Sequence, residues 1–577
     1  MSRPLTAESA IYEMNRTLAI SVYGITVLFF TLFFAYPIWH TVKEAFVTPE
    51  GSLTLSYINE LFKNPIYVEG LINSFYMGLF TTLLCLFIAL PLALMANYWD
   101  FRGKELLNSL ILVPLILPPF VGALGVRQFL GQSGVFNTFL IELGLMDAKA
   151  PYDWLGEGQL FGVVLMNALH LYPIAYLNVS AALANVDPAT EEAAENLGCH
   201  GIRRLFRVTL PMIMPGVFAG ATIIFIWSFT ELGVPLIFDF SRVTSVQIFD
   251  GIKDLSGNPF PYALVVIMLA ATVFFYLLGK WLFGGSVGAS TGRAATGRTL
   301  KTASPLANLL CIGSFVLVTG FAVLPHLGVI LLSVSEQWYG TLLPQNWTNL
   351  HYFDALGHPL TLSSIGNSLK YASLATAVNV ILGIAIAYVV VRTKLPGRQF
   401  LDAVSMLPLA VPGLVLAFGY LSMTREGQPF HFLILGENPI LILVIAYAVR
   451  RLPYVVRSAA AGFQQTSVTL EEAGQNLGCP PLKTLAKVTL PLIAANLIAG
   501  GLLAFSFAML EVSDSLILAE QSQYFPITKA IYALVTSLGN GPHLASALGV
   551  WAMTFLGITI VGAGVILGKK LGALFRV

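Results

Sequence analysis

The chain has 577 residues, of which 56% are hydrophobic and only 11% are charged, against the roughly 25% charged residues of an average soluble domain. Its 31 lysines and arginines balance its 30 aspartates and glutamates, so there is no basic excess of the kind that nucleic-acid binding requires. The 51 glycines and 31 prolines are tolerated in transmembrane helices, where neighbouring helices satisfy the freed backbone groups. The composition therefore excludes an ordinary soluble domain and indicates a polytopic membrane protein.

Apolar stretches long enough to cross a bilayer, which takes about 20 residues, follow one another along the whole chain. In the first half they lie at 18–39, 71–97, 106–129, 160–182, 213–237 and 262–283. In the second half they lie at 306–333, 367–391, 400–422, 440–461, 493–518 and 544–567. We therefore expect an all-α fold with about twelve transmembrane helices. The connections between them are too short for an ATPase domain or a binding domain.

Lysine and arginine concentrate in alternate connections, which indicates the cytoplasmic side. Most of them fall inside if the N-terminus is cytoplasmic, and both termini are then cytoplasmic. The segment 284–305 is rich in Gly, Ser, Thr and Ala and carries positive charge, which predicts a flexible cytoplasmic linker.

The two halves repeat one another, as in many transporters. An offset of 294 residues aligns Asn73-Ser74 with Asn367-Ser368, Pro114 with Pro408, and Pro118 with Pro412. An offset of 280 residues aligns Asn196 to Cys199 with Asn476 to Cys479, and Glu231 with Glu511. The difference between the two offsets falls in the loop at 130–159. We predict a first repeat at 1–283, the linker at 284–305 and a second repeat at 306–577, related by an axis along the membrane normal.

The most specific repeated segment lies between the fourth and fifth spans of each half, on the cytoplasmic side. The first copy reads EEAAENLGCHGIRRLFRVTLP from Glu191 to Pro211, and the second reads EEAGQNLGCPPLKTLAKVTLP from Glu471 to Pro491. Asp187 and Ser467 precede these segments as helix caps, and Gly198 and Gly478 suit the left-handed residue that ends a helix. We call the segments 187–211 and 467–491 the docking loops.

Two interpretations of these loops compete. Considered alone, one such loop fits an amphipathic hairpin that only connects two spans. Its recurrence at the same topological position favours a surface that docks a soluble partner. The candidate docking residues are Glu191, Glu192, Ala193, Ala194, Gly198, Leu210 and Pro211 in the first copy, and Glu471, Glu472, Ala473, Gly474, Gly478, Leu490 and Pro491 in the second.

These residues resemble the EAA signature of permeases of binding-protein-dependent ABC importers. In the first copy the match consists of Glu192-Ala193-Ala194, Gly198, Val208 and Leu210-Pro211. The second copy departs from the signature at Gly474, where alanine is expected, and glycine weakens a helix by about 1 kcal/mol. The resemblance covers both halves, with five spans of each as the family core and the first span peripheral. A fused, double-length permease of this kind looks most like the iron(III) branch, which includes thiamine and 2-aminoethylphosphonate systems.

The resemblance implies a type I importer of the bacterial inner membrane, with alternating access of the permease. Two copies of a cytosolic ATP-binding cassette subunit would each receive one docking loop, and a periplasmic or lipid-anchored binding protein would deliver the solute. ATP and magnesium would belong to the ATPase, because this chain has no GxxxxGK[ST] motif and we expect it to bind no cofactor and to catalyse no reaction.

Three acidic residues near the outer ends of the fifth spans are candidates for the substrate pathway, because ionisable groups inside a membrane are costly. They are Glu231, Glu511 and Asp514. Helix capping or a structural salt bridge is the alternative role. As a negatively charged vestibule they would favour a cation, so we rank iron(III) first, thiamine or a polyamine next, and 2-aminoethylphosphonate last.

Prolines in the third spans could build a gate or simply curve the helices; these are Pro114, Pro118, Pro408 and Pro412. For Arg450 and Arg451 we favour contacts between helices, and for His170 a packing role. The four cysteines show no CxxC pairing, so no fixed metal site is expected.

An ion-driven secondary transporter with two parallel six-helix halves is the main rival function. It would explain the spans and the carboxylates within them. It leaves the repeated docking loops without a role.

Overall fold

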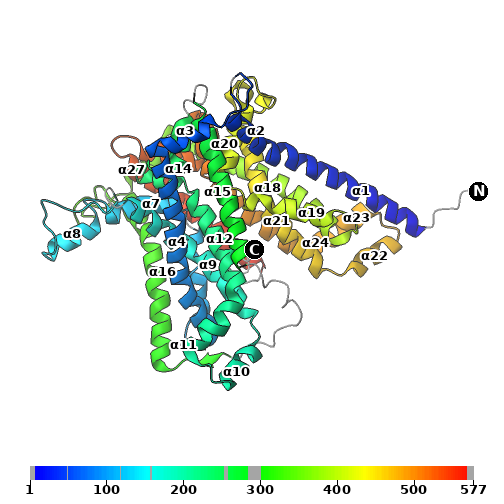
Figure 1. Cartoon of the computed structure of the whole chain (residues 1–577), viewed down its shortest axis with the longest axis horizontal. Coiled ribbons are helices and arrows are strands. Elements are labelled where there is room, and N and C mark those ends of the chain that lie inside the picture. The colour runs from blue at the N-terminus through cyan, green and yellow to red at the C-terminus, as the bar shows by residue number, and fades with distance from the viewer. Residues whose placement is uncertain are drawn as a thin grey trace, which may run out of the picture.

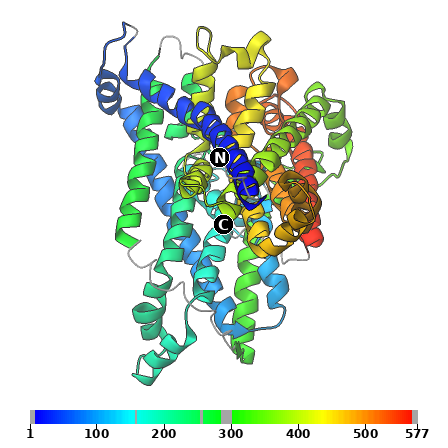
Figure 2. The same ribbon diagram turned by 90° about the vertical axis from the view of Figure 1, so that its right-hand side faces the viewer.

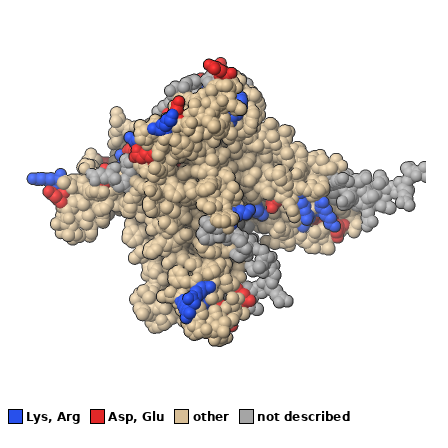
Figure 3. Space-filling model, viewed as in Figure 1, with Lys and Arg blue, Asp and Glu red and all other residues tan. Residues whose placement is uncertain are grey.

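The computed structural model describes residues 7–48, 50–116, 118–155, 159–252, 258–283 and 300–567. Most of this part of the chain is helical (Figure 1). On the face shown in Figure 3, charged side chains gather at the ends of the molecule and the surface between them is almost uncharged. Such a surface suits the hydrocarbon of a bilayer, in which charges are costly. The protein is an all-α polytopic membrane protein, as predicted.

The helices of the first half are α1 (Ala7–Phe30), α2 (Tyr36–Phe46), α3 (Ser56–Lys63), α4 (Pro65–Tyr98), α5 (Lys104–Leu110), α6 (Val113–Ile116), α7 (Pro119–Leu130), α8 (Val135–Glu142), α9 (Gln159–Ala184), α10 (Pro188–Asn196), α11 (Gly201–Arg204), α12 (Leu210–Phe229), α13 (Gly233–Ile237), α14 (Thr244–Gly251) and α15 (Phe260–Phe283).

The helices of the second half are α16 (Pro305–Ser333), α17 (Leu350–Gly357), α18 (Pro359–Arg392), α19 (Arg398–Met406), α20 (Gly413–Thr424), α21 (Ile440–Gln465), α22 (Val468–Asn476), α23 (Pro481–Thr484), α24 (Leu490–Met509), α25 (Ser513–Leu518), α26 (Ile527–Val535) and α27 (Gly541–Leu567).

The described residues contain nine helices that are long and apolar enough to cross a membrane, and eleven spans if two bent helix pairs count as one span each. Helix α21 carries Arg450, Arg451 and Arg457, which lowers its apolar character. It packs on α18 and α24 as α9 packs on α4 and α12, so it occupies the place of a twelfth span.

The third span of each half is broken, where the sequence left open whether its prolines break the helix or only curve it. The break separates α6 from α7 with a bend of 93°, and α19 from α20 with a bend of 95°. Pro118 and Pro412 stand at the two breaks in extended conformation, with ψ of 127° and 136°. Proline lacks the N–H that a continuous helix would use, so the equivalent prolines explain the equivalent bends.

The fifth spans are interrupted near their outer ends: the first reaches the predicted Ile237 across a short break, and the second ends at Met509, earlier than predicted. Helix α12 ends at Phe229 and α24 at Met509, and the short helices α13 and α25 follow after a few non-helical residues. The predicted spans 213–237 and 493–518 ran through these breaks, because the apolar pattern continues across them.

Each half begins with a span that packs against the other half. Helix α2 packs against α20, and α16 packs against α7. Glycine permits both contacts, because a Cβ at Gly419 would stand 2.8 Å from the carbonyl oxygen of Pro37, and one at Gly125 would overlap the carbonyl oxygen of Pro325. The exchanged first spans therefore tie the two halves together.

The apolar core is shared between the halves on one side of the molecule and divided on the other. One large cluster contains buried residues of α7, α13 and α15 from the first half and of α20, α21 and α27 from the second. Toward the docking loops, one cluster belongs to α4, α9, α12 and the exchanged α16, and another to α18, α21 and α24. The halves are joined at one side and diverge toward α10 and α22, which lie at the ends of two separate arms (Figures 1 and 2).

The predicted linker at 284–305 lies mostly outside the described residues. The described residues 300–305 include a short strand, which the prediction of a flexible linker did not foresee. Lys301–Thr302 forms strand β2, which pairs in parallel with β1 (Trp99–Asp100) at the end of α4.

Candidate functional site

The two docking helices, α10 and α22, have the same local structure. Each has nine residues. Asp187 accepts a hydrogen bond from the backbone N–H of Ala189 at 2.9 Å, and Ser467 accepts one from that of Thr469 at 3.3 Å. Gly198 and Gly478 end the helices with φ of 80° and 84°, a left-handed conformation in which glycine is favoured.

The same side chains point outward in both docking loops. Glu192 and Glu472 are exposed, and Leu197 and Leu477 are 88% and 89% exposed. The end of each arm therefore presents an acidic residue and a leucine at the surface of the molecule.

Glu191 and Glu471, which we predicted to be docking residues, are turned inward and are only 2% and 7% exposed. Glu191 accepts hydrogen bonds from the hydroxyl groups of Tyr98 and Thr209. Glu471 forms an ion pair with Arg392 at 2.9 Å. A carboxylate that is bound within its own chain is not available to a partner, so the first glutamate of each copy has an internal role.

Gly474, the one departure from the EAA pattern, does not shorten α22. A Cβ at this position would lie 3.3 Å from Cγ2 of Thr484, so glycine fits where α22 approaches α23.

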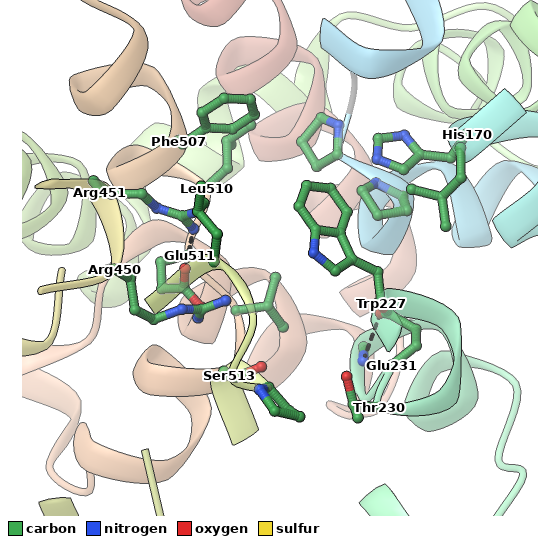
Figure 4. Close-up of a pocket in the computed structure, with 18 of the residues that line it drawn as sticks. His170, Trp227, Thr230, Glu231, Arg450, Arg451, Phe507, Leu510, Glu511 and Ser513 are labelled. Atoms are coloured by element: carbon green, nitrogen blue, oxygen red, sulfur yellow. Dashed lines mark hydrogen bonds and ion pairs between the residues drawn. The ribbon is translucent and has the colours of Figure 1, made fainter. Parts of the chain in front are cut away.

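A central cavity of about 190 Å³ lies where the two halves meet (Figure 4). Of the predicted pathway residues, Glu231, Glu511, Pro118, Pro408 and Pro412 line it. Pro114 lies behind the wall, where its carbonyl oxygen accepts a hydrogen bond from His170 Nδ1 at 2.8 Å. Asp514 is fully buried behind Glu511.

Glu231 is held by backbone N–H groups and not by an arginine. One of its oxygens, Oε1, accepts hydrogen bonds from the backbone N–H groups of Gly233 at 3.0 Å and Val234 at 3.3 Å. Glu231 therefore caps α13, as the alternative interpretation held. Among the described residues it has no ion pair.

Glu511 stands at the equivalent place in the opposite wall and is neutralised. It forms ion pairs with Arg450 and Arg451, and Arg450 also lies 3.5 Å from Asp514. The arginines thus make contacts between helices, as we favoured. They correct the charge argument, because the two guanidinium groups balance the two carboxylates of the wall, Glu231 and Glu511. Asp514 lies behind the wall, so the lining is not the negatively charged vestibule that we predicted.

Two aromatic residues and one polar residue of the wall, Asn167, were missed in the sequence, and His170, for which we favoured a packing role, also lines the cavity. Trp227 and Phe507 face the cavity from opposite sides (Figure 4), each four residues before its glutamate, and this repeated spacing was a signal that the sequence offered. Asn167 is buried, and its Nδ2 has no hydrogen-bond partner within the part of the chain that the structure describes. His170, one turn further along α9, donates from Nδ1 to Pro114 and therefore keeps the lone pair of Nε2 as an acceptor.

The described residues contain no group of three His, Cys, Asp or Glu side chains that could hold a metal ion. A tightly chelated metal therefore has no preformed site in this part of the chain.

Two like halves of membrane-spanning helices, a cavity between them and a docking helix at the end of each arm define the permease subunit of a transporter. The chain belongs to the family of the binding-protein-dependent transport system inner membrane component, whose model matches residues 86–286 and 379–567. The family domain is thus present twice, and the chain is a fused, double-length permease of the type I ABC importer class.

Relatives of known description agree with this assignment. The putative ferric transport system permease protein FbpB 1 of Haemophilus influenzae is 28% identical over 480 residues, which cover 80% of this chain and 70% of that protein. The spermidine/putrescine transport system permease protein PotB of the same organism is 27% identical over 42% of this chain and 87% of its own length. The putative 2-aminoethylphosphonate transport system permease protein PhnU of Salmonella typhimurium is 25% identical over 41% and 82%.

Among solved structures, a bacterial ABC transporter involved in the import of the acidic polysaccharide alginate aligns with a TM-score of 0.41 and 19% identity. The alignment covers 48% of this chain and 97% of that chain.

Proposed function

We propose that this chain is the permease of an ATP-driven importer that passes a small solute from a binding protein to the cytoplasm by alternating access. The observation that carries the proposal is the pair of equivalent docking helices on two diverging arms. With the docking loops in the cytoplasm, the shared core closes the outer side and the separated arms open the cavity inward. ATP-driven approach of the arms would reverse this arrangement.

The partners follow from the two docking surfaces. Two copies of a cytosolic ATP-binding cassette subunit bind α10 and α22, and they hold the ATP and magnesium. A periplasmic or lipid-anchored binding protein delivers the solute at the outer side. Both termini of the chain are cytoplasmic in this arrangement, and the chain itself binds no cofactor.

For the solute, iron(III) remains our first choice, followed by thiamine or a polyamine and then 2-aminoethylphosphonate. The support is the name of the ferric permease relative that matches across both halves, together with the unpaired carboxylate of Glu231. Because the two arginines of the lining balance its two carboxylates, the cavity itself gives a cation little preference. Selection of the solute therefore rests mainly with the binding protein.

An ion-driven transporter accounts for the cavity and leaves the two docking helices unexplained. Uptake by the permease, reconstituted with its ATPase and binding protein, separates the two functions. We expect uptake that requires ATP and persists with an uncoupler. Uptake that an uncoupler abolishes, and that proceeds without the ATPase, would overturn the proposal.

A further inference from the structure

The first glutamate of each docking loop is bound to the end of the second span of its own half. Tyr98, the last residue of α4, donates its hydroxyl hydrogen bond to Glu191. Arg392, the last residue of α18, donates Nε to Glu471 at 2.9 Å and Nη2 to the carbonyl oxygen of Thr466 at 2.8 Å. We call these two contacts the inner anchors.

The inner anchors use different chemistry at equivalent positions. Tyr98 and Arg392 are related by the offset of 294, and Thr209 and Thr489 by the offset of 280. Thr209 donates to Glu191 at 2.6 Å, whereas the buried hydroxyl of Thr489 has no hydrogen-bond partner among the described residues, because Arg392 satisfies Glu471. The same mechanical link is therefore made once by two hydroxyl groups and once by a guanidinium.

A second repeated contact lies near the other end of the same two helices. Ser74 accepts from the backbone N–H of Thr244, the first residue of α14, at 2.9 Å. Ser368 accepts from that of Ile527, the first residue of α26, at 2.8 Å. These serines belong to the repeated Asn-Ser pair, whose asparagines also donate to the loops before α14 and α26. We call these contacts the outer anchors.

Helices α14 and α26 meet across the two halves on the closed side. The ring of Phe249 lies 6.3 Å from that of Tyr532. The ammonium group of Lys529 lies 5.8 Å from the Phe249 ring, a favourable cation–π arrangement. To open the outer side, these contacts must part.

We propose that α4 and α18 are the links that carry the movement of the docking helices to this outer contact. Each helix has 34 residues. A repeated polar contact holds each helix at its inner end and another holds it at Ser74 or Ser368, about 36 Å away at 1.5 Å per residue. The inference rests on the proposed function. It assigns Tyr98, Arg392, Glu191 and Glu471 as positioning residues that transmit force and do not touch the ATPase.

The test replaces Arg392, the inner anchor of the second half, first with alanine and then with the tyrosine found in the first half. Arg392→Ala removes the partner of Glu471, and in the reconstituted complex we expect solute transported per ATP to fall about tenfold, as for loss of a buried charge-assisted hydrogen bond. Arg392→Tyr supplies the hydroxyl of the first half and allows Thr489 to donate as Thr209 does, so it should restore most of the coupling. Arg398→Ala, which removes a nearby arginine bound to Thr393, is the control and should behave as the wild type.

The distance between α14 and α26 shows whether movement of the docking helices still reaches the outer contact in each variant. Nitroxide labels at the exposed positions Asp250→Cys and Thr536→Cys, after replacement of the four native cysteines, report the separation of α14 and α26 by pulsed electron paramagnetic resonance. A nonhydrolysable ATP analogue should lengthen this distance in the wild type and in Arg392→Tyr, and leave it unchanged in Arg392→Ala. In all three proteins the ATPase should still co-purify.

Two results would overturn the inference: equal lengthening and equal coupling in Arg392→Ala and the wild type, or an Arg392→Tyr variant as impaired as Arg392→Ala. If the wild type showed neither ATP-dependent uptake nor ATPase binding, the proposed function itself would be refuted. The two failures are therefore distinguishable.

Discussion

Glu231 and Glu511 occupy equivalent positions in the two halves and face the same central cavity, yet their carboxylates have different partners. Glu231 accepts two backbone hydrogen bonds and caps α13. Glu511 is held by two arginines. The repeat has therefore kept the acidic residue and changed its electrostatic role, so the two glutamates should respond differently to the same substitution.

Glu231→Gln should lower uptake of a cationic solute severalfold without destabilising the protein. The glutamine carbonyl oxygen can accept the same two backbone hydrogen bonds, while the charge of the one wall carboxylate that has no ion pair among the described residues is lost. Initial uptake rates at limiting solute measure the effect, with Glu142→Gln at the exposed end of α8 as the control. Equal rates in Glu231→Gln and the wild type would remove the structural support for a cation.

Glu511→Gln should instead destabilise the fold. It leaves two buried guanidinium groups without their main partner, and removing one member of a buried ion pair costs about 3–5 kcal/mol. Thermal unfolding in detergent should show a lower midpoint than for Glu231→Gln, and Arg451→Gln on the Glu511→Gln background should recover part of the loss. A midpoint equal to that of the wild type would mean that these ion pairs contribute little.

Charge reversal at the exposed glutamates of the docking loops should release the ATPase. In the double variant Glu192→Lys with Glu472→Lys, both outward-facing acidic groups become basic, while the caps and the inner anchors remain. Co-purification with the ATPase and ATP-dependent uptake should both be lost, whereas Glu105→Lys on α5 should preserve them. A double variant that keeps both properties would show that the loops only connect spans.

Gly419→Ala should weaken the contact of the exchanged first span. The added methyl group would stand 2.8 Å from the carbonyl oxygen of Pro37, and overpacking of this kind costs about 1–3 kcal/mol. Gly313→Ala on α16, where a methyl group meets nothing within 4 Å, is the matched control and should be neutral or stabilising. The unfolding midpoints of the two variants decide the point, and equal midpoints would contradict the close packing seen here.

The sequence predicted the spans and the docking loops because both depend on local patterns. Apolar length defines a span, and Asp187 and Gly198 mark the ends of α10 by backbone chemistry that acts within a few residues. The same holds for Ser467 and Gly478.

What the sequence could not predict depends on contacts between distant segments. Glu191 and Glu192 are adjacent and chemically identical, and contacts with distant residues such as Tyr98 and Thr209 hold Glu191 in the buried position. The pairing of Arg450 with Glu511 spans 61 residues, and the exchange of the first spans between halves depends on tertiary packing at Gly125 and Gly419. The break after Phe229 escaped prediction because apolar residues lie on both sides of it.

The central claim is that ATP drives the two docking helices together and thereby closes the inward-open cavity. Asn196 and Asn476 are exposed, equivalent positions at the ends of α10 and α22, so labels at Asn196→Cys and Asn476→Cys measure the separation of the arms directly. In the complete reconstituted complex the account predicts a distance that shortens when a nonhydrolysable ATP analogue binds and returns when it is removed. A distance that stays the same with and without nucleotide, in a complex that still imports its solute, would contradict the account.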